Sequence, residues 1–225
     1  MSARGLFVTG TDTGVGKTRV AVALIHALRA RGLRVAAMKP VSAGAGPGRL
    51  NEDVAALRAA SNVDVALQDM NPYAFDPPIA PHIAAELAGV AIDLDRIAEA
   101  YARLAATADV VVVEGAGGWR VPLSMESDMA DLAVRLGLPV VLVVGMRLGC
   151  LNHACLTAEA IRASGLPLTG WIANRIDPAM PFADENRAAL SARLPAPCLG
   201  TQPYAPVPSA EGTYDWLILP EELAS

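Results

Sequence analysis

Residues 10–18 read Gly10-Thr11-Asp12-Thr13-Gly14-Val15-Gly16-Lys17-Thr18, a glycine-rich turn that ends in Lys-Thr. The apolar stretch Leu6-Phe7-Val8 precedes it, and apolar residues recur at helical spacing after it. Glycines let successive backbone N–H groups point at phosphate oxygens, and the positive dipole end of the new helix faces the same place. This stretch predicts a strand, a phosphate-binding loop and a helix, the unit on which nucleotide-binding α/β folds are built.

Two side chains of the loop have expected roles. Lys17 would reach the β- and γ-phosphates of a nucleotide, and the Thr18 hydroxyl would take Mg²⁺. The spacing is slightly irregular, because the usual pattern places a glycine where this chain has Thr11 and its own glycine comes one step earlier, at Gly10. The alternative is an ordinary strand-to-helix turn with a lysine on the surface.

Length and composition favour one compact unit. A chain of 225 residues, 53% of them hydrophobic and 19 of them glycine, fits a single domain over residues 1–225 with a sheet buried under small-residue helices. The net charge of −5 without a basic block argues against a nucleic-acid partner. The apolar runs are too short to cross a bilayer, so we expect no membrane partner. The sequence shows no signal-peptide pattern, which predicts a cytoplasmic location. Three cysteines without metal-ligand spacing indicate reduced, structural thiols.

Strand and helix patterns alternate along the chain, which forces parallel crossovers. Further strands are expected at residues 34–38, 109–114, 139–144 and 168–174, with a helix over 94–104 and another that Ser127 would cap. The proline-rich part from 195 to 208 suggests surface loops, followed by a short strand at 216–219. The expected fold class is therefore α/β, a three-layer P-loop NTPase fold with a mostly parallel sheet and helices on both faces. In such sheets the ligand binds at the carboxyl ends of the strands.

Glu114 follows the apolar run Val110-Val111-Val112-Val113. Nucleotide hydrolases use a carboxylate at such a strand end as a second Mg²⁺ contact, and Gly115-Ala116-Gly117 would leave backbone room beside a ligand. A buried carboxylate is costly unless a metal or cation pairs with it. The alternative is a solvated acid at the end of a strand.

Three other polar residues near strand or helix ends are open to two interpretations. Asp53 is either a Mg²⁺ ligand or a capping acid in the first turn of a helix. Lys39 follows a buried strand and precedes Pro40, so it is either a site residue or a surface charge. Asn174 either presents its amide to a purine or occupies a turn.

Taken together, these motifs resemble those of the dethiobiotin synthetases. Besides the phosphate loop, the matching stretches are Lys39-Pro40-Val41-Ser42-Ala43-Gly44, Asn51-Glu52-Asp53, Asn71-Pro72-Tyr73-Ala74-Phe75, Pro81-His82, Val113-Glu114-Gly115-Ala116-Gly117-Gly118-Trp119, Leu148-Gly149-Cys150-Leu151-Asn152-His153-Ala154 and Gly170-Trp171-Ile172-Ala173-Asn174. They occur in the family's order and extend to about residue 175. The phosphate loop identifies only the superfamily, whereas the Lys-Pro-Val-Ser and Leu-Gly-Cys-Leu-Asn-His blocks together are selective.

The resemblance implies ATP-dependent ring closure of 7,8-diaminononanoate with CO₂ or bicarbonate, giving dethiobiotin, ADP and phosphate. It implies Lys17 and Lys39 as catalytic cations, and Thr18, Asp53 and Glu114 as Mg²⁺ ligands. It assigns ATP binding to Gly14, Val15, Gly16, Lys17, Thr18, Arg19, Asp53, Glu114, Gly115, Ala116, Gly117, Asn174, Arg175, Pro203, Tyr204 and Ala205. It assigns substrate binding to Thr11, Ser42, Gly149, Cys150, Leu151 and Asn152. The last four open a helix that serves the other subunit, so a homodimer with active sites at its interface is implied.

Two other classes share the fold. Chromosome-partition and septum-positioning ATPases carry a signature lysine in the phosphate loop, where this chain has Asp12, and the chain lacks a basic amphipathic C-terminal helix. Cobyrinate-type amidoligases need a glutaminase domain for which 225 residues leave no space. Both therefore fit the sequence less well than a dethiobiotin synthetase.

Overall fold

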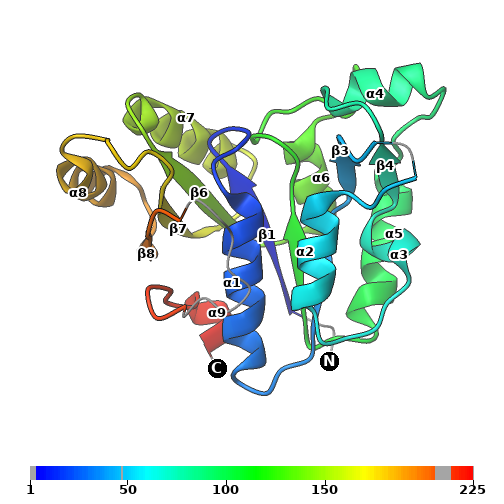
Figure 1. Cartoon of the computed structure of the whole chain (residues 1–225), viewed down its shortest axis with the longest axis horizontal. Coiled ribbons are helices and arrows are strands. Elements are labelled where there is room, and N and C mark those ends of the chain that lie inside the picture. The colour runs from blue at the N-terminus through cyan, green and yellow to red at the C-terminus, as the bar shows by residue number, and fades with distance from the viewer. Residues whose placement is uncertain (1–3, 47, 206–213, 225) are drawn as a thin grey trace.

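A computed structural model describes residues 4–46, 48–205 and 214–224. Its main sheet has six parallel strands in the order β2-β5-β1-β6-β7-β8 (Figure 1). The strands are β1 (Arg4–Gly10), β2 (Val35–Met38), β5 (Val110–Glu114), β6 (Val140–Met146), β7 (Leu168–Arg175) and β8 (Cys198–Gln202). The predicted parallel α/β fold is confirmed.

Helices cover both faces of this sheet. One face carries α1 (Lys17–Arg29), α2 (Glu52–Ala60) and α9 (Glu221–Ala224), and the other carries α5 (Leu94–Ala105), α6 (Met129–Leu136) and α7 (Cys150–Ala163), with α8 (Ala183–Arg193) against α7. Side chains alternate across a strand, so Leu6 and Val8 of β1 enter the core under α1 while Phe7 enters the opposite core. Each face of the sheet therefore has its own hydrophobic core, which makes three layers.

A second, two-stranded sheet follows β2. It pairs β3 (Val41–Ala43) with β4 (Tyr73–Phe75) in parallel, next to the short helices α3 (Leu67–Met70) and α4 (Pro81–Leu87). Strands of three residues leave too short a pattern to detect, so the sequence did not predict them. This small sheet supports the segment that follows Lys39.

Three expectations about local structure are wrong. Asp128 rather than Ser127 caps α6, because its carboxylate accepts from the Ala130 and Asp131 amides and Asp131 completes a capping box. The proline-rich part contains strand β8, although positions 206–208 lie outside the described residues. Residues 216–219 form no strand, and only an isolated bridge joins Leu217 to Gly200.

Within the described ranges, no helix is both long and apolar enough to span a lipid bilayer.

Candidate active site

The phosphate loop, residues 11–16, connects β1 to α1 at the carboxyl end of the sheet (Figure 1). The Thr11 amide donates to the Val143 carbonyl of β6 at 3.0 Å, and the Lys17 ammonium donates to the Asp12 carbonyl at 2.9 Å. Gly16 has a φ of 89°, and a Cβ there would lie 2.0 Å from the Asn174 amide nitrogen. Only glycine fits this position, and the loop is held from both sides.

A cluster of charged groups lies beside the loop. The buried Lys39 ammonium contacts the buried Glu114 carboxylate at 2.5 Å and the Asp53 carboxylate at 2.9 Å. The Thr18 hydroxyl lies 2.7 Å from Asp53 and 2.9 Å from Glu114. Four elements thus meet at one point: the end of β2, the end of β5, and the starts of α1 and α2.

Burial and charge shift the pKa values of this cluster. Burial lowers the pKa of Lys39, but the charges and hydrogen bonds of Glu114 and Asp53 outweigh it and hold the pKa above 10.5. Burial likewise opposes ionisation of Asp53, yet the Lys39 charge and the Thr18 hydroxyl keep its pKa below 3.8. Burial raises the pKa of Glu114 despite Lys39. Burial and the nearby Lys39 charge together lower the pKa of Lys17 to about 8.

The donor set of this cluster suits Mg²⁺. Two carboxylates and a hydroxyl converge, and Oε2 of Glu114 is buried without a hydrogen-bond donor. No group of three His, Cys, Asp or Glu residues within the described ranges could hold a metal. Mg²⁺ is usually held by one or two carboxylates, with water and phosphate oxygens completing its shell, so the residues present fit this ion.

Asp53 is not the cap of its helix. Asn51 is the N-cap of α2, and its side-chain oxygen accepts from the amides of Asp53 and Val54. The Asp53 carboxylate is therefore directed to Thr18 and Lys39, and the capping interpretation is wrong. The surface-charge interpretation of Lys39 and the solvated-acid interpretation of Glu114 are also wrong, because both side chains are buried.

The segment after β5 adjoins the phosphate loop. The Gly115 amide donates to the Val8 carbonyl at 3.0 Å. A Cβ on Gly117, whose φ is 62°, would lie 3.5 Å from the Thr13 hydroxyl. Ala116 lies between them and is partly buried. Residues 115–117 therefore lie beside the phosphate loop. This is the position at which the sequence predicts that they leave room for a ligand.

Residues expected to bind the nucleoside come from β7 and the segment after β8. Asn174 is fully buried and donates to the Val15 carbonyl at 2.7 Å, while its side-chain oxygen has no partner among the described groups. Arg19 donates to the Ala205 carbonyl at 3.0 Å, next to the exposed Pro203 and Tyr204. The Arg175 side chain is instead paired with Asp184 of α8 at 2.6 Å.

The opening of α7 follows β6. Gly149 is its N-cap with a φ of 95° and no side-chain cap, and the amides of Leu151 and Asn152 donate to no described group. Cys150 is buried, whereas Asn152 is exposed. Just before this opening, Arg147 pairs with the Asp12 carboxylate of the phosphate loop at 2.5 Å.

Ser42 lies on β3, three positions after Lys39, and is almost fully buried. Its hydroxyl donates to the side-chain oxygen of Asn71 at 2.9 Å, and the Asn71 amide nitrogen donates to the Lys39 carbonyl at 2.6 Å. No pattern in the sequence gives Asn71 a role of its own. An asparagine before proline suggests only a turn, so contacts from another part of the chain were needed to find it.

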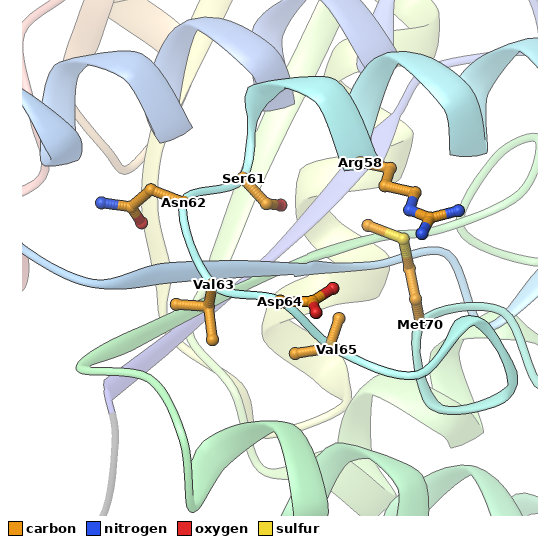
Figure 2. A pocket seen from close by; sticks show the side chains of 7 residues that line it. All are labelled: Arg58, Ser61, Asn62, Val63, Asp64, Val65 and Met70. Atoms are coloured by element: carbon orange, nitrogen blue, oxygen red, sulfur yellow. The ribbon is translucent and has the colours of Figure 1, made fainter.

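One hollow lies away from these residues. It has a volume of about 230 Å³ and is lined by Arg58, residues 61–65 and Met70, at the carboxy-terminal end of α2 (Figure 2). Asn62 bonds the Val35 amide at the start of β2, which is the end of the sheet opposite Lys39. Convergent charged groups gather at the phosphate loop and not here, so the loop is the candidate active site.

Comparison with known proteins gives close matches. A family described as an AAA domain matches residues 4–211. The ATP-dependent dethiobiotin synthetase of Nitrosospira multiformis is 58% identical, over 89% of this chain and 88% of that protein. The enzyme of the same name from Xanthomonas oryzae is 52% identical, over 98% of this chain and the whole of that protein.

Solved structures show the fold alone. The septum site-determining protein MinD of Pyrococcus horikoshii, solved with Mg-ADP, matches with a TM-score of 0.56 at 17% identity, over 91% of this chain and 82% of that one. MinD of Aquifex aeolicus matches with a TM-score of 0.57 at 16% identity, over 91% and 83%.

Proposed function

The chain belongs to the ATP-dependent dethiobiotin synthetase family, and from that premise we propose that the Lys39 cluster at the phosphate loop is its reaction centre. The enzyme is a ligase that forms C–N bonds in biotin biosynthesis. It joins 7,8-diaminononanoate and CO₂ at the expense of ATP and gives dethiobiotin, ADP and phosphate. The observation that carries the assignment of the centre is the buried Lys39 ammonium, fixed between two carboxylates beside Lys17 and Thr18.

The proposed chemistry needs cations more than a nucleophile. One substrate amine attacks CO₂ and loses a proton, which gives a carbamate. A carbamate oxygen attacks the γ-phosphorus and ADP leaves, and the second amine then attacks the carbamoyl carbon and expels phosphate. Negative charge builds on the carbamate and the transferring phosphoryl group in a buried site, where preplaced cations stabilise it.

Two lysines supply fixed charge in this proposal. Lys39 is held charged by Glu114 and Asp53 and serves the carbamate and the transferring phosphoryl group. Lys17, whose ammonium lies on the phosphate loop, serves the β- and γ-phosphates. Mg²⁺ bound by Thr18, Asp53 and Glu114 would supply Lewis-acid neutralisation of the phosphates.

Nucleotide and substrate contacts complete the proposal. Backbone amides of residues 14–18 bind phosphate, residues 115–117 lie beside the phosphate loop and bind the nucleotide, and Arg19, Asn174, Arg175 and residues 203–205 hold the nucleoside. Thr11 and Ser42 orient the reacting groups.

A homodimer is proposed on the surface of α7. Leu148 is 97% exposed and Leu156 is 56% exposed, which leaves apolar surface for a partner. The amides of Leu151 and Asn152, which donate to no described group, favour an anion, such as the substrate carboxylate of the neighbouring subunit. We place the enzyme in the cytoplasm as one domain over residues 1–225.

A product assay tests the function. Purified protein is incubated with 7,8-diaminononanoate, bicarbonate and MgATP, and dethiobiotin is measured by mass. Lys17→Ala, verified as folded, should lower product formation by about 10²-fold or more, because charge stabilisation at the γ-phosphate is lost. Release of ADP without dethiobiotin, or near-normal turnover by the variant, would contradict the proposal.

A further inference from the structure

The Lys39 backbone lies just past the last paired residues of β2. The ladder between β2 and β5 ends where Met38 pairs with Val113, and Pro40 has no N–H group with which to extend it. The Lys39 amide donates instead to the carbonyl of Met70, the last residue of α3, at 2.8 Å. The backbone that carries the Lys39 side chain is therefore held by a segment outside the main sheet.

Asn71 holds the Lys39 carbonyl from that same segment. Its side-chain nitrogen lies 2.6 Å from the Lys39 carbonyl oxygen and 3.1 Å from the Tyr73 carbonyl oxygen. Both oxygens can only accept, so the NH₂ group must face them. The side-chain oxygen then faces Ser42, whose hydroxyl donates to it at 2.9 Å. Asn71 is 8% exposed and Ser42 is 2% exposed, so these hydrogen bonds form one buried network that ends on the Lys39 carbonyl.

Two sets of contacts thus restrain Lys39. Glu114 and Asp53 hold its ammonium group, and Met70 and Asn71 hold its backbone. The two carboxylates are also the proposed Mg²⁺ ligands, so their oxygens would be shared between the ammonium group and the metal. A lysine side chain is a flexible four-carbon stem, and its ammonium group then depends on the backbone from which it extends. The Asn71 contact involves neither carboxylate and is independent of that sharing.

We propose that Asn71 is a positioning residue for Lys39, and that Ser42 acts through Asn71 and not by contact with the substrate. The inference rests on the proposed function, which makes Lys39 a catalytic cation. The Ser42 hydroxyl fixes the orientation of the Asn71 amide, and the amide fixes the peptide group that follows Lys39. The network therefore sets the point from which the Lys39 ammonium reaches the reacting groups.

The first test separates turnover from nucleotide binding. Asn71→Ala should lower the kcat for dethiobiotin formation about tenfold to a hundredfold, the scale expected when a catalytic group is misplaced by about 1 Å. The Kd for ATP should change less than about twofold, because Lys17 and the phosphate loop keep their contacts. An unchanged kcat in the folded variant overturns the proposal, and so does an equal loss of ATP affinity.

Ser42→Ala tests the same network if Asn71→Ala does not fold. The variant keeps the Asn71 side chain and removes the donor that orients it, so kcat should fall about three- to tenfold. The KM for 7,8-diaminononanoate should stay within about twofold of the native value, because Ser42 does not touch the diamine. In the Asn71→Ala background the same change should have no further effect on kcat. An unchanged kcat, a diamine KM raised fivefold or more, or an equal effect in both backgrounds overturns the proposal.

Asn62→Ala is the matched control. Asn62 also bridges two backbone groups of the chain, the Val35 amide and the Leu33 carbonyl, at the opposite end of β2. Its loss should lower the melting temperature and leave kcat within about twofold of native. A fall in kcat equal to that of Asn71→Ala marks the effect as general destabilisation and overturns the proposal.

Crystal structures of the free native enzyme, Asn71→Ala and Ser42→Ala locate Lys39 without turnover. The Lys39 carbonyl should shift by more than about 0.5 Å in at least one variant, beyond the tolerance of a preorganised site. A Lys39 backbone that superposes on the native one in both variants overturns the proposal. If Lys39 shifts but the native enzyme forms no dethiobiotin, the proposed function fails and the positioning by Asn71 stands.

Discussion

The Lys39 ammonium group neutralises only part of the charge around it, because it contacts both Asp53 and Glu114. One positive and two negative groups leave the cluster with an excess negative charge beside a loop built for phosphate. That excess favours a divalent cation between carboxylates and phosphates. Lys39 and Mg²⁺ therefore act as complementary cations in the proposed site, one fixed by the fold and one delivered with the nucleotide.

Asp53→Asn tests the metal assignment. We expect the variant to need at least about tenfold more Mg²⁺ for half-maximal activity, because a direct ligand loses its charge. Without metal, its melting temperature should change little, since Asn51 still caps the helix and the Asp53 side chain is 42% exposed. Glu114→Gln is less informative, since it removes a counter-charge from the buried Lys39 and destabilises the fold as well.

Glu52→Gln is the control for that experiment. Glu52 lies in the first turn of the same helix and is exposed. The variant therefore removes one negative charge near the positive end of the helix dipole, as Asp53→Asn does. Its Mg²⁺ requirement should equal that of the native enzyme. An unchanged Mg²⁺ requirement in Asp53→Asn would remove Asp53 from the metal site.

The lowered pKa of Lys17 predicts a pH dependence of ATP binding. Burial and Lys39 bring this pKa to about 8 in the free site, and a bound triphosphate must raise it by favouring the charged amine. Below pH 8 Lys17 is protonated with or without ATP, and affinity is constant. Above pH 8 binding takes up a proton, and the Kd for ATP should rise by up to about tenfold per pH unit until the pKa of the complex is passed.

Calorimetry in two buffers of different ionisation enthalpy measures this uptake directly. We expect almost no proton uptake at pH 7 and close to one proton at pH 9. Lys17→Arg keeps its charge across this range and should show no such rise, whatever its affinity. A native Kd that stays constant from pH 7 to 9 would contradict the shifted pKa.

At the scale of single residues, the sequence patterns identify site residues but not the side chains that these residues contact. The motif context singled out Lys39, Glu114 and Thr18, yet the pairing of Lys39 with both acids arises from three separate segments of the chain. The cap on Asn51 and the orientation of Asn71 are likewise side-chain contacts that no spacing encodes. Residue types predict which chemistry is available, and folding decides which atoms meet.

At the scale of elements, the phosphate loop is joined to the segment before α7. Asp12 accepts from the Thr13 amide, pairs with Arg147 and supplies the carbonyl that holds Lys17. The position at which partition ATPases carry their signature lysine thus holds an anchor in this chain. Movement of the loop and of the opening of α7 should be coupled through this pair.

Arg147→Gln tests this coupling. We expect the Kd for ATP to rise about three- to fivefold, the scale of one partly exposed ion pair, because the Asp12 carbonyl no longer holds Lys17 in place. The melting temperature should remain close to native. Arg34→Gln breaks a similarly exposed pair with Asp109, at the far end of the sheet, and should leave ATP binding unchanged. Equal effects of the two variants on ATP binding would show that Arg147 has no specific role at the loop.

The length and burial of an element decided whether the sequence predicted it. The buried strands of β1, β2, β5, β6 and β7 leave apolar runs that stand out, and all were expected near their observed positions. Strand β8 was missed because Gly200 and the flanking prolines indicate a loop, although its backbone pairs with β7. Strands β3 and β4 have only three residues each, which is too short for a recognisable hydrophobic pattern. They are strands because they pair with each other.

For the whole molecule, strand order explains where the site lies. Strand β1 has β5 and β2 on one side and β6, β7 and β8 on the other, so the chain changes direction at β1. Ligands bind at such a switch point, at the carboxyl ends of the strands. The phosphate loop, Glu114 and the opening of α7 all follow strands that meet there. The same arrangement leaves the exposed Leu148 at the surface beside the site.

If α7 binds substrate in the neighbouring subunit's site, two inactive variants can complement each other in a mixed dimer, which a monomeric enzyme could not do. Asn152→Asp places a negative charge at the opening of α7 and should weaken binding of the substrate carboxylate by repulsion. Lys17→Ala disables phosphoryl transfer in its own subunit. In a mixed dimer one site carries both defects and the other carries neither, so activity should reappear after two inactive variants exchange subunits. Exchange is followed with differently tagged chains. If tagged chains exchange and no mixture exceeds its parents, α7 serves its own subunit or binds no substrate.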